Sequence, residues 1–298
     1  MTNKGRRKAK ESAFREYFSH IGELRSFFPD VSVLALTATA SNLLQSSIKD
    51  SLAIPCCKVI NVCPNKDNIR YSVLKVQRDI PTTLYWMVDK LMDEEEHFPR
   101  TLVYCTSIAH AANLYDYFKR EYPKSVLYTT MYHSETDDVV KDYALGEMRK
   151  ITNSTLRIIF CTSALGMGID MKKFNCVIHY GPSVDLESYI QESGRIGRDG
   201  TPSHAVMLYH GGMLRDCCPK MRKFIKNTSV CRRLALFSEF ASTIDIDKFK
   251  NKPLHHSCCD ICENDSKYIE KVLIHNQVTG RTSNNDLLQI YSHLISQL

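Results

Sequence analysis

Five short apolar runs, each set off by polar or amphipathic sequence, constrain the fold of this 298-residue chain more than any other feature. The stretch IAHAANLYDYFKREY, which separates the first two runs, has the apolar spacing of a helix. Alternating strands and helices form right-handed βαβ units, so we predict a parallel α/β sheet with helices on both faces. The runs, rich in β-branched and aromatic residues, are TLVYC (101–105), SVLYT (125–129), RIIFC (157–161), CVIHY (176–180) and HAVMLYH (204–210).

Changes of pattern on either side of these runs divide the chain into segments. VSVLALTATAS (31–41) is also strand-like, but Pro64, Asn65 and Asn68 indicate a linker between it and the later runs. After about residue 215 the strand pattern ends, and a helical segment around SVCRRLALFSEFA precedes a group of cysteines and histidines. A polar, helical tail follows. The expected segments are therefore 1–64, 65–215, 216–265 and 266–298.

Composition narrows the class of protein. A formal charge of +6, from 39 basic and 33 acidic residues, favours anionic partners. The basic NKGRRKAK near the N-terminus is typical either of a nuclear-import or phosphate-contacting arm or of a solvated tail. No apolar run approaches the ~18 residues of a membrane span, and no signal-peptide core follows the N-terminal charges. We therefore expect a nuclear or cytosolic protein without a membrane partner.

The stretch SYIQESGRIGRDG (188–200) places two arginines, Arg195 and Arg198, among glycines after a helical pattern. We expect that helix to begin at Ser183 as its N-cap and to end at Gly194. Ligands of parallel sheets bind at the carboxyl ends of the strands. This loop lies at the opposite end of the helix from its entry, so we expect it to project at a domain edge. Its guanidinium groups suit phosphate oxygens, although ion pairs of Arg195 with Glu192 and of Arg198 with Asp199 are an alternative.

The order LALTATA, TLVYCTS, FCTSALGMGID, VIHYGPS and QESGRIGRDG resembles the motif series of superfamily-two helicases, and its wording closely resembles the RecQ family of DNA helicases. The resemblance extends from about Phe14 to Cys262. It implies a RecA-like second helicase lobe, preceded by a remnant of the first lobe and followed by a zinc-binding module. It also implies ATP, Mg²⁺ and single-stranded or forked DNA as ligands, 3′ to 5′ unwinding in DNA repair and recombination, and a nuclear location.

The resemblance assigns a catalytic and coupling role to several residues. Arg198 matches the arginine finger of the family, Arg195 helps to couple the lobes, and Gln191 senses the nucleotide from the end of its helix. Asp170, with Gly168 beside it, matches a position near the nucleotide sugar, although the glycines of this motif would also suit a simple tight turn. Thr37 and Thr39 match the motif that links the ATP site to DNA, although such hydroxyl residues also make turns and helix caps.

Hydroxyl residues after two of the runs are the candidates for DNA contact. Thr106 and Ser107 follow TLVYC, and Thr162 and Ser163 follow RIIFC. Hydroxyl and amide groups at such strand ends hold phosphates without reading bases. His133 matches a Tyr-His pair of the family, but Glu135 stands where the family usually has glycine, which weakens the assignment of a DNA contact there.

The C-terminal cluster HHSCCDIC (255–262) predicts a structural zinc site. Cys231, His256, Cys259 and Cys262 offer three thiolates and one imidazole, a set that zinc binds tetrahedrally, and a C-x-x-C in an intracellular chain favours metal over a disulfide. The RecQ family has a cysteine where His256 stands. His255 and Cys258 are rivals one residue out of register, and Cys217 and Cys218 are more distant candidates. Free thiols without metal are the remaining alternative.

Two motifs of a complete helicase motor do not occur in these 298 residues: a G-x-x-x-x-G-K-S/T phosphate loop and a D-E-x-H box. We therefore expect that the chain alone does not hydrolyse ATP. Three interpretations follow: a piece of a full helicase, a non-catalytic protein that binds single-stranded DNA, or a protein-interaction adaptor built on the zinc module.

Overall fold

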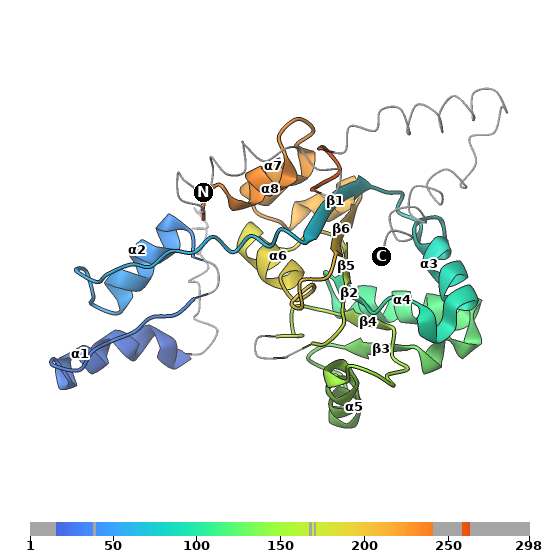
Figure 1. Cartoon of the computed structure of the whole chain (residues 1–298), viewed down its shortest axis with the longest axis horizontal. Helices are drawn as coiled ribbons and strands as arrows, with labels where there is room; N and C mark the ends of the chain where they lie inside the picture. The colour runs from blue at the N-terminus through green and yellow to red at the C-terminus, as the bar shows by residue number, and fades with distance from the viewer. Residues whose placement is uncertain (1–15, 38–39, 167–168, 170, 241–257, 263–298) are drawn as a thin grey trace, which may run out of the picture.

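A computed structural model describes residues 16–37, 40–166, 169, 171–240 and 258–262, and a parallel sheet lies at its centre (Figure 1). Its six strands follow the order β1-β6-β5-β2-β4-β3, and every neighbouring pair is parallel. The predicted α/β fold is therefore confirmed. The strands are β1 (Ile69–Lys75), β2 (Thr101–Cys105), β3 (Thr129–Tyr132), β4 (Ile158–Cys161), β5 (Cys176–Tyr180) and β6 (Ser203–Tyr209).

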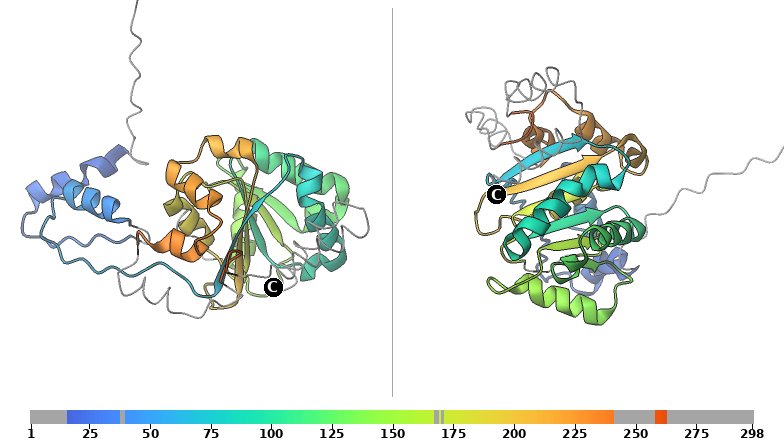
Figure 2. Two further views of the ribbon diagram at one scale, coloured as in Figure 1. Left: turned by 90° about the horizontal axis from the view of Figure 1, so that it is seen from above. Right: turned by 90° about the vertical axis from the view of Figure 1, so that its right-hand side faces the viewer.

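Helices cover both faces of the sheet, as the views in Figure 2 show. On one face, α3 (Ile80–Glu94) and α4 (Ile108–Glu121) bury an apolar core against the strands. On the other, α5 (Asp138–Arg149) and α6 (Leu186–Ser193) share a second core with the C-terminal helices. The short connections η2 (Glu95–His97) and η3 (Pro123–Leu127) are 3-10 turns. Two apolar faces explain why the central strands are apolar throughout.

After the sheet, the chain adds a small C-terminal layer. It contains η4 (Gly211–Arg215), α7 (Pro219–Lys226), α8 (Arg232–Phe237) and the segment 258–262, which lies against the edge of β1 through a bridge between Tyr71 and Cys259. Figure 1 shows α7 and α8 next to β1 and β6. Among the described residues, no helix has the length and apolar character needed to cross a membrane.

The N-terminal part differs from the prediction. It contains η1 (Glu16–Glu23), α1 (Leu24–Phe27) and α2 (Asn42–Ser51), but residues 31–37 form no strand. Leu34 and Leu36 are 81% and 84% exposed. A strand is stable only when neighbours bond its main chain and cover its side chains, and no described strand pairs with this segment.

Two further local predictions are wrong. The strand expected over 125–129 is replaced by η3, because Pro123 favours a helical turn, and β3 begins only at Thr129. In addition, β1 lies in the stretch that we interpreted as linker. Its residues Ile69, Tyr71 and Val73 pack into the core shared by α5 and α6. The alternation of these three positions is the signal that identifies the strand.

Candidate functional site

The loop that carries Arg195 and Arg198 lies at the amino edge of the sheet, where β1, β5 and β6 begin. The Gly197 amide donates to the Phe174 carbonyl over 3.2 Å, and the Ser203 amide donates to the Asn68 carbonyl over 2.9 Å. The loop therefore lies at the edge of the sheet opposite to the carboxyl ends of the strands, which is the end of the helix where it was expected.

The helix before this loop starts later than expected. Asp185, not Ser183, is the N-cap of α6, and its carboxylate accepts from the Ser188 amide at 2.8 Å. The Ser183 hydroxyl instead donates to Glu192 over 2.6 Å, and the same carboxylate oxygen lies 3.1 Å from Nε2 of His179. Glu192, suggested above as a partner of Arg195, is therefore held by two other residues. The helix ends at Gly194 as predicted, where a Cβ atom would lie 2.8 Å from the Ile190 carbonyl oxygen.

The two arginines have different environments. Arg195 is buried, with 8% of its surface exposed, and its Nε lacks a hydrogen-bond partner within the described part of the chain. Arg198 is exposed, and its Nη1 donates to the Ile169 carbonyl over 3.3 Å. The Asp199 carboxylate accepts a hydrogen bond from the Thr201 hydroxyl, and its Oδ2 lies 3.5 Å from Lys173 Nζ. The hydrogen bonds from Thr201 lower the pKa of the Asp199 carboxyl group. Arg198 therefore has the exposure that contact with an external phosphate requires.

The linker before β1 holds the main chain of the arginine loop. Lys66 Nζ donates to the carbonyls of Gly194 and Ile196 at 2.7 and 3.2 Å. Asn68 Nδ2 donates to those of Gly197 and Thr201 at 2.9 and 2.7 Å. Burial lowers the pKa of Lys66, and the charge of nearby Arg198 lowers it further. Sequence reasoning identified this stretch as a linker and missed its role as a clamp.

A buried arginine of α8 holds the linker in turn. Arg233 is 6% exposed and donates to the carbonyls of Lys66 and Ile69, each at 2.6 Å, and also to the side chain of Asn65. These contacts connect α8, whose N-cap is Cys231, to the linker and through it to the arginine loop. We call the contacts made by Lys66, Asn68 and Arg233 the linker clamp.

The candidates for DNA contact gather at the carboxyl edge of the sheet. Thr106 follows β2 and Thr162 follows β4, and these two strands are neighbours. Ser107 caps α4 by accepting from the His110 amide at 3.1 Å, while Thr106 Oγ1 lies 2.8 Å from His110 Nδ1. Thr162 Oγ1 accepts from the Ala164 amide at 3.4 Å. A hydroxyl that accepts a hydrogen bond still has its own hydrogen to donate, so these roles are compatible with phosphate binding.

The remaining candidates are more scattered. His133 is 8% exposed, and this burial does not favour a DNA contact by its ring. Gln191 and Thr37 are exposed, as is Ser163 beside Thr162. Thr39, Gly168, Asp170 and His256 lie outside the described residues.

The loop after β4 links the two edges. It leaves Thr162 at the carboxyl edge, is anchored by the buried side chains of Leu165 and Met171, and passes Ile169, whose carbonyl accepts from Arg198 at the amino edge. The same loop therefore contacts both predicted sites, which is the arrangement that coupling between them requires.

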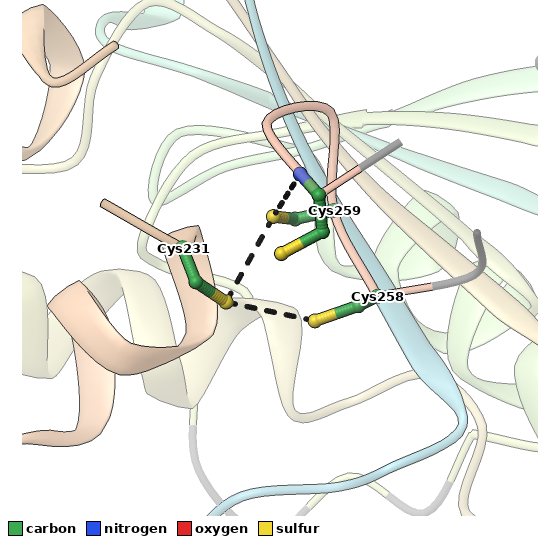
Figure 3. A group of neighbouring side chains, drawn as sticks. Cys231, Cys258 and Cys259 are labelled. Atoms are coloured by element: carbon green, nitrogen blue, oxygen red, sulfur yellow. Dashed lines mark hydrogen bonds between the residues drawn. The ribbon is translucent and has the colours of Figure 1, made fainter. Parts of the chain in front are cut away.

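Four thiols meet beside the edge of β1. The Sγ atoms of Cys231, Cys258, Cys259 and Cys262 all lie within 4.8 Å of one another. Cys231 is 3.6 Å from Cys258 and 4.0 Å from Cys259, close to the roughly 3.8 Å between thiolates that bind zinc tetrahedrally at about 2.3 Å. Figure 3 shows Cys231, the N-cap of α8, opposite Cys258 and Cys259. The donor set fits zinc.

Main-chain contacts fix which residues enter this cluster. The Tyr71 amide donates to the Cys258 carbonyl over 3.3 Å, and the Asp260 amide donates to the Tyr71 carbonyl over 3.1 Å. Asp260 also binds Arg232, with 3.0 Å between Oδ1 and Nε. This register along β1 brings in Cys258, which the sequence offered only as a rival to His256.

Comparisons with known proteins place this geometry in context. Residues 83–200 match the helicase conserved C-terminal domain. The ATP-dependent DNA helicase hus2/rqh1 of Schizosaccharomyces pombe is 26% identical over 278 residues, covering 87% of this chain and 20% of the relative. The RecQ-like DNA helicase BLM of Xenopus laevis is 31% identical over 200 residues, covering 66% of this chain and 14% of the relative. The chain thus spans a fifth or less of these two curated relatives.

Among solved structures, Mss116p bound to single-stranded RNA and AMP-PNP superposes with a TM-score of 0.55 at 17% identity, covering 68% of this chain and 42% of that one. At this identity the likeness concerns the fold alone. It is the fold expected from the alternation of strands and helices.

Proposed function

Because the chain belongs to the RecQ family of superfamily-two helicases, we propose that its sheet is the second RecA-like lobe of an ATP-dependent helicase that unwinds DNA from 3′ to 5′. In this proposal residues 65–215 are that lobe, and 1–64 are the end of the first lobe. Residues 216–265 are the zinc module, and 266–298 are a tail. Work on DNA in repair and recombination would place the protein in the nucleus.

One observation carries the proposal: an exposed arginine lies on a clamped loop at one edge of the sheet, and a single connection joins it to hydroxyl residues at the other edge. When a neighbouring lobe holds ATP and Mg²⁺, the Arg198 guanidinium would neutralise charge that develops on the transferring phosphoryl group. Arg195, which is buried, would position the loop. Gln191, Thr37, Thr39, Gly168 and Asp170 would complete the nucleotide side.

DNA phosphates would bind at the carboxyl edge through Thr106, Ser107, Thr162 and Ser163, with His133 a weaker candidate because its ring is buried. Such contacts hold the backbone without reading the bases. The loop between Thr162 and Ile169 would transmit movement between DNA and nucleotide, since its two ends lie at the two sites.

Zinc, when bound, would supply a fixed tetrahedral cross-link between Cys231 on α8 and the segment 258–262. The four cysteines provide a complete donor set, so Cys258 is the fourth ligand in this proposal in place of His256. The residues of this module then keep Arg233 in position against the linker.

The test compares Arg198→Ala and Arg198→Lys in a gene product that carries this chain together with a phosphate-binding loop. We expect DNA-stimulated ATP turnover to fall about 10³- to 10⁵-fold in both variants while single-stranded DNA affinity is unchanged. The 298 residues alone should bind single-stranded DNA with a steep salt dependence and no ATP turnover. Turnover that survives Arg198→Ala would contradict the catalytic role, and absence of DNA binding would contradict the helicase assignment.

A further inference from the structure

Two adjoining cavities at the carboxyl edge of the sheet extend away from the predicted DNA contacts. The first, of about 550 Å³, is lined by Thr106 and Ser107 and by residues of η4. The second, of about 600 Å³, lies between the ends of β1 and β6 and helix α7. Gly212 and Arg215 line both cavities, so the cavities adjoin at these residues, and we treat the two together as one groove.

Among the charged residues that line this groove, cations outnumber acids five to one. We call the residues Lys75, Arg78, Arg215, Arg222 and Lys226, with the glycines between them, the basic groove. Among its described lining residues, Asp216 in the first cavity is the one acid, and the second cavity has four cations and no acid. All five cations are exposed. Like charges repel each other in the absence of an anion, so this arrangement favours an anionic ligand.

The fold itself collects these cations. Lys75 and Tyr209, the last residues of β1 and β6, lie side by side in register. Helix α7 buries Met221, Phe224 and Ile225, so Arg222 and Lys226, four residues apart, face outward together.

Hydrogen bonds hold one cation of the groove in place, and at a glycine the main chain of the groove is accessible. Arg222 Nε donates to the Cys217 carbonyl at 3.0 Å, and its Nη2 donates to the Arg215 carbonyl at 3.3 Å. This arginine is therefore fixed against the turn before α7. A Cβ atom at Gly211 would meet nothing within 4 Å, so the main chain there is open to a close approach by a ligand.

We propose that the basic groove binds successive phosphates of a nucleic-acid strand and carries that strand from the end of β2 to α7. The inference rests on the proposed function, because Thr106 and Ser107 line the first cavity of the same groove. It adds a second stretch of contact that hydroxyl residues alone do not provide. Backbone contacts of this type are independent of base sequence.

The experiment measures binding of a fluorescent single-stranded oligonucleotide by anisotropy across a salt series. The test variant is Arg215→Gln/Lys226→Gln, which leaves Arg222 and its structural bonds intact. The control is Lys119→Gln/Lys223→Gln, which removes the same charge from exposed residues outside the groove, one of them on α7 itself. Thermal unfolding of each variant confirms that it folds.

We expect the groove variant to bind about tenfold more weakly and to lose about 1.4 from the slope of log K against log salt, since each phosphate contact on a single strand contributes about 0.7. The control should change affinity less than about twofold. If the wild-type chain binds no DNA, the proposed function fails. If it binds DNA but the groove variant keeps the wild-type affinity and slope, the groove inference alone fails.

A second arm separates a strand from a small polyanion. Calorimetry with inorganic tripolyphosphate should give no saturable binding that depends on Arg215 and Lys226. If tripolyphosphate shows saturable binding that depends on these two residues, and DNA affinity is unchanged in the groove variant, the groove is a site for a free polyphosphate and the inference is wrong.

Discussion

The two edges of the sheet are built in different ways. At the amino edge, Lys66 and Asn68 hold four carbonyls of the arginine loop, and Arg233 holds the linker that carries them. At the carboxyl edge, exposed hydroxyls and cations line open cavities. Transfer of a single phosphoryl group requires an arginine in a fixed position, because a small displacement of a catalytic group lowers the reaction rate. A polymer with many equal phosphates requires only a positive, accessible surface.

Removal of the metal should give the largest difference between the two edges. A chelator, or Cys258→Ser, should release zinc and unfold the C-terminal layer, because metal binding and folding are linked in such modules by several kcal/mol. The linker clamp should then open, and amide hydrogen exchange in residues 194–202 should rise far more than in 101–118. Mass spectrometry should find one zinc per chain.

The matched controls also identify the fourth ligand. Cys56→Ser, at an exposed cysteine outside the cluster, should leave zinc content and hydrogen exchange unchanged. His256→Ala should keep the zinc if Cys258 is the ligand. Loss of zinc from His256→Ala with retention in Cys258→Ser would restore the original sequence prediction.

Arg233→Lys should give the next largest effect. An ammonium group cannot replace the several hydrogen bonds of the guanidinium to linker oxygens, so we expect a loss of about 2–4 kcal/mol in the free energy of unfolding. Chemical denaturation measures this loss, and Lys223→Ala on the exposed side of α7 should change stability by less than about 0.5 kcal/mol. Exchange at 194–202 should rise while exchange around 210–215 stays constant. Equal increases at both edges would mean that Arg233 stabilises the lobe generally and does not clamp one edge.

A buried histidine gives the amino edge a pH dependence. Burial, with the charge of Arg70 as the second cause, lowers the pKa of His204 from 6.5 to about 4. Its folded pKa lies below its unfolded value, so its contribution to stability is complete above pH 6.5 and is lost as the pH falls towards 4. Between pH 7.5 and pH 5, the free energy of unfolding of the wild type should fall by about 2 kcal/mol more than that of His204→Gln. Urea denaturation measures both proteins at each pH. If the free energies of unfolding of wild type and His204→Gln change in parallel with pH, His204 does not contribute to the pH dependence.

How far the sequence could predict these edges depends on the range of the interactions. β2 and β5 match their predicted bounds, because apolar content alone specifies a strand buried on both faces. The arginine loop and the cysteines on α8 and in C-x-x-C are also local patterns. In contrast, β1 alternates apolar and polar residues, a weaker signal than an apolar run, and Arg70 and Ser72 are buried because neighbouring segments cover them.

The linker clamp and the fourth cysteine could not be predicted for a related reason. Lys66 and Asn68 act on residues about 130 positions away, and Arg233 acts on residues more than 160 positions before it. No local spacing encodes such contacts. Likewise, Cys258 and His256 were close alternatives by spacing, and the hydrogen bonds to Tyr71 place Cys258 in the cluster.

Substitutions of Ser107 should give the smallest effect and the most selective one, because its hydroxyl has two roles at the carboxyl edge. Ser107→Ala removes the cap of α4 and should cost about 1 kcal/mol in the free energy of unfolding. Ser107→Asp keeps a good cap, but its carboxylate cannot donate to a phosphate and repels it. We therefore expect Ser107→Asp to keep wild-type stability in denaturation and to bind single-stranded DNA several-fold more weakly in anisotropy. If Ser107→Asp binds DNA as well as wild type does, Ser107 is only a helix cap, and the phosphate contact at this edge must come from Thr106 and the cations beyond it.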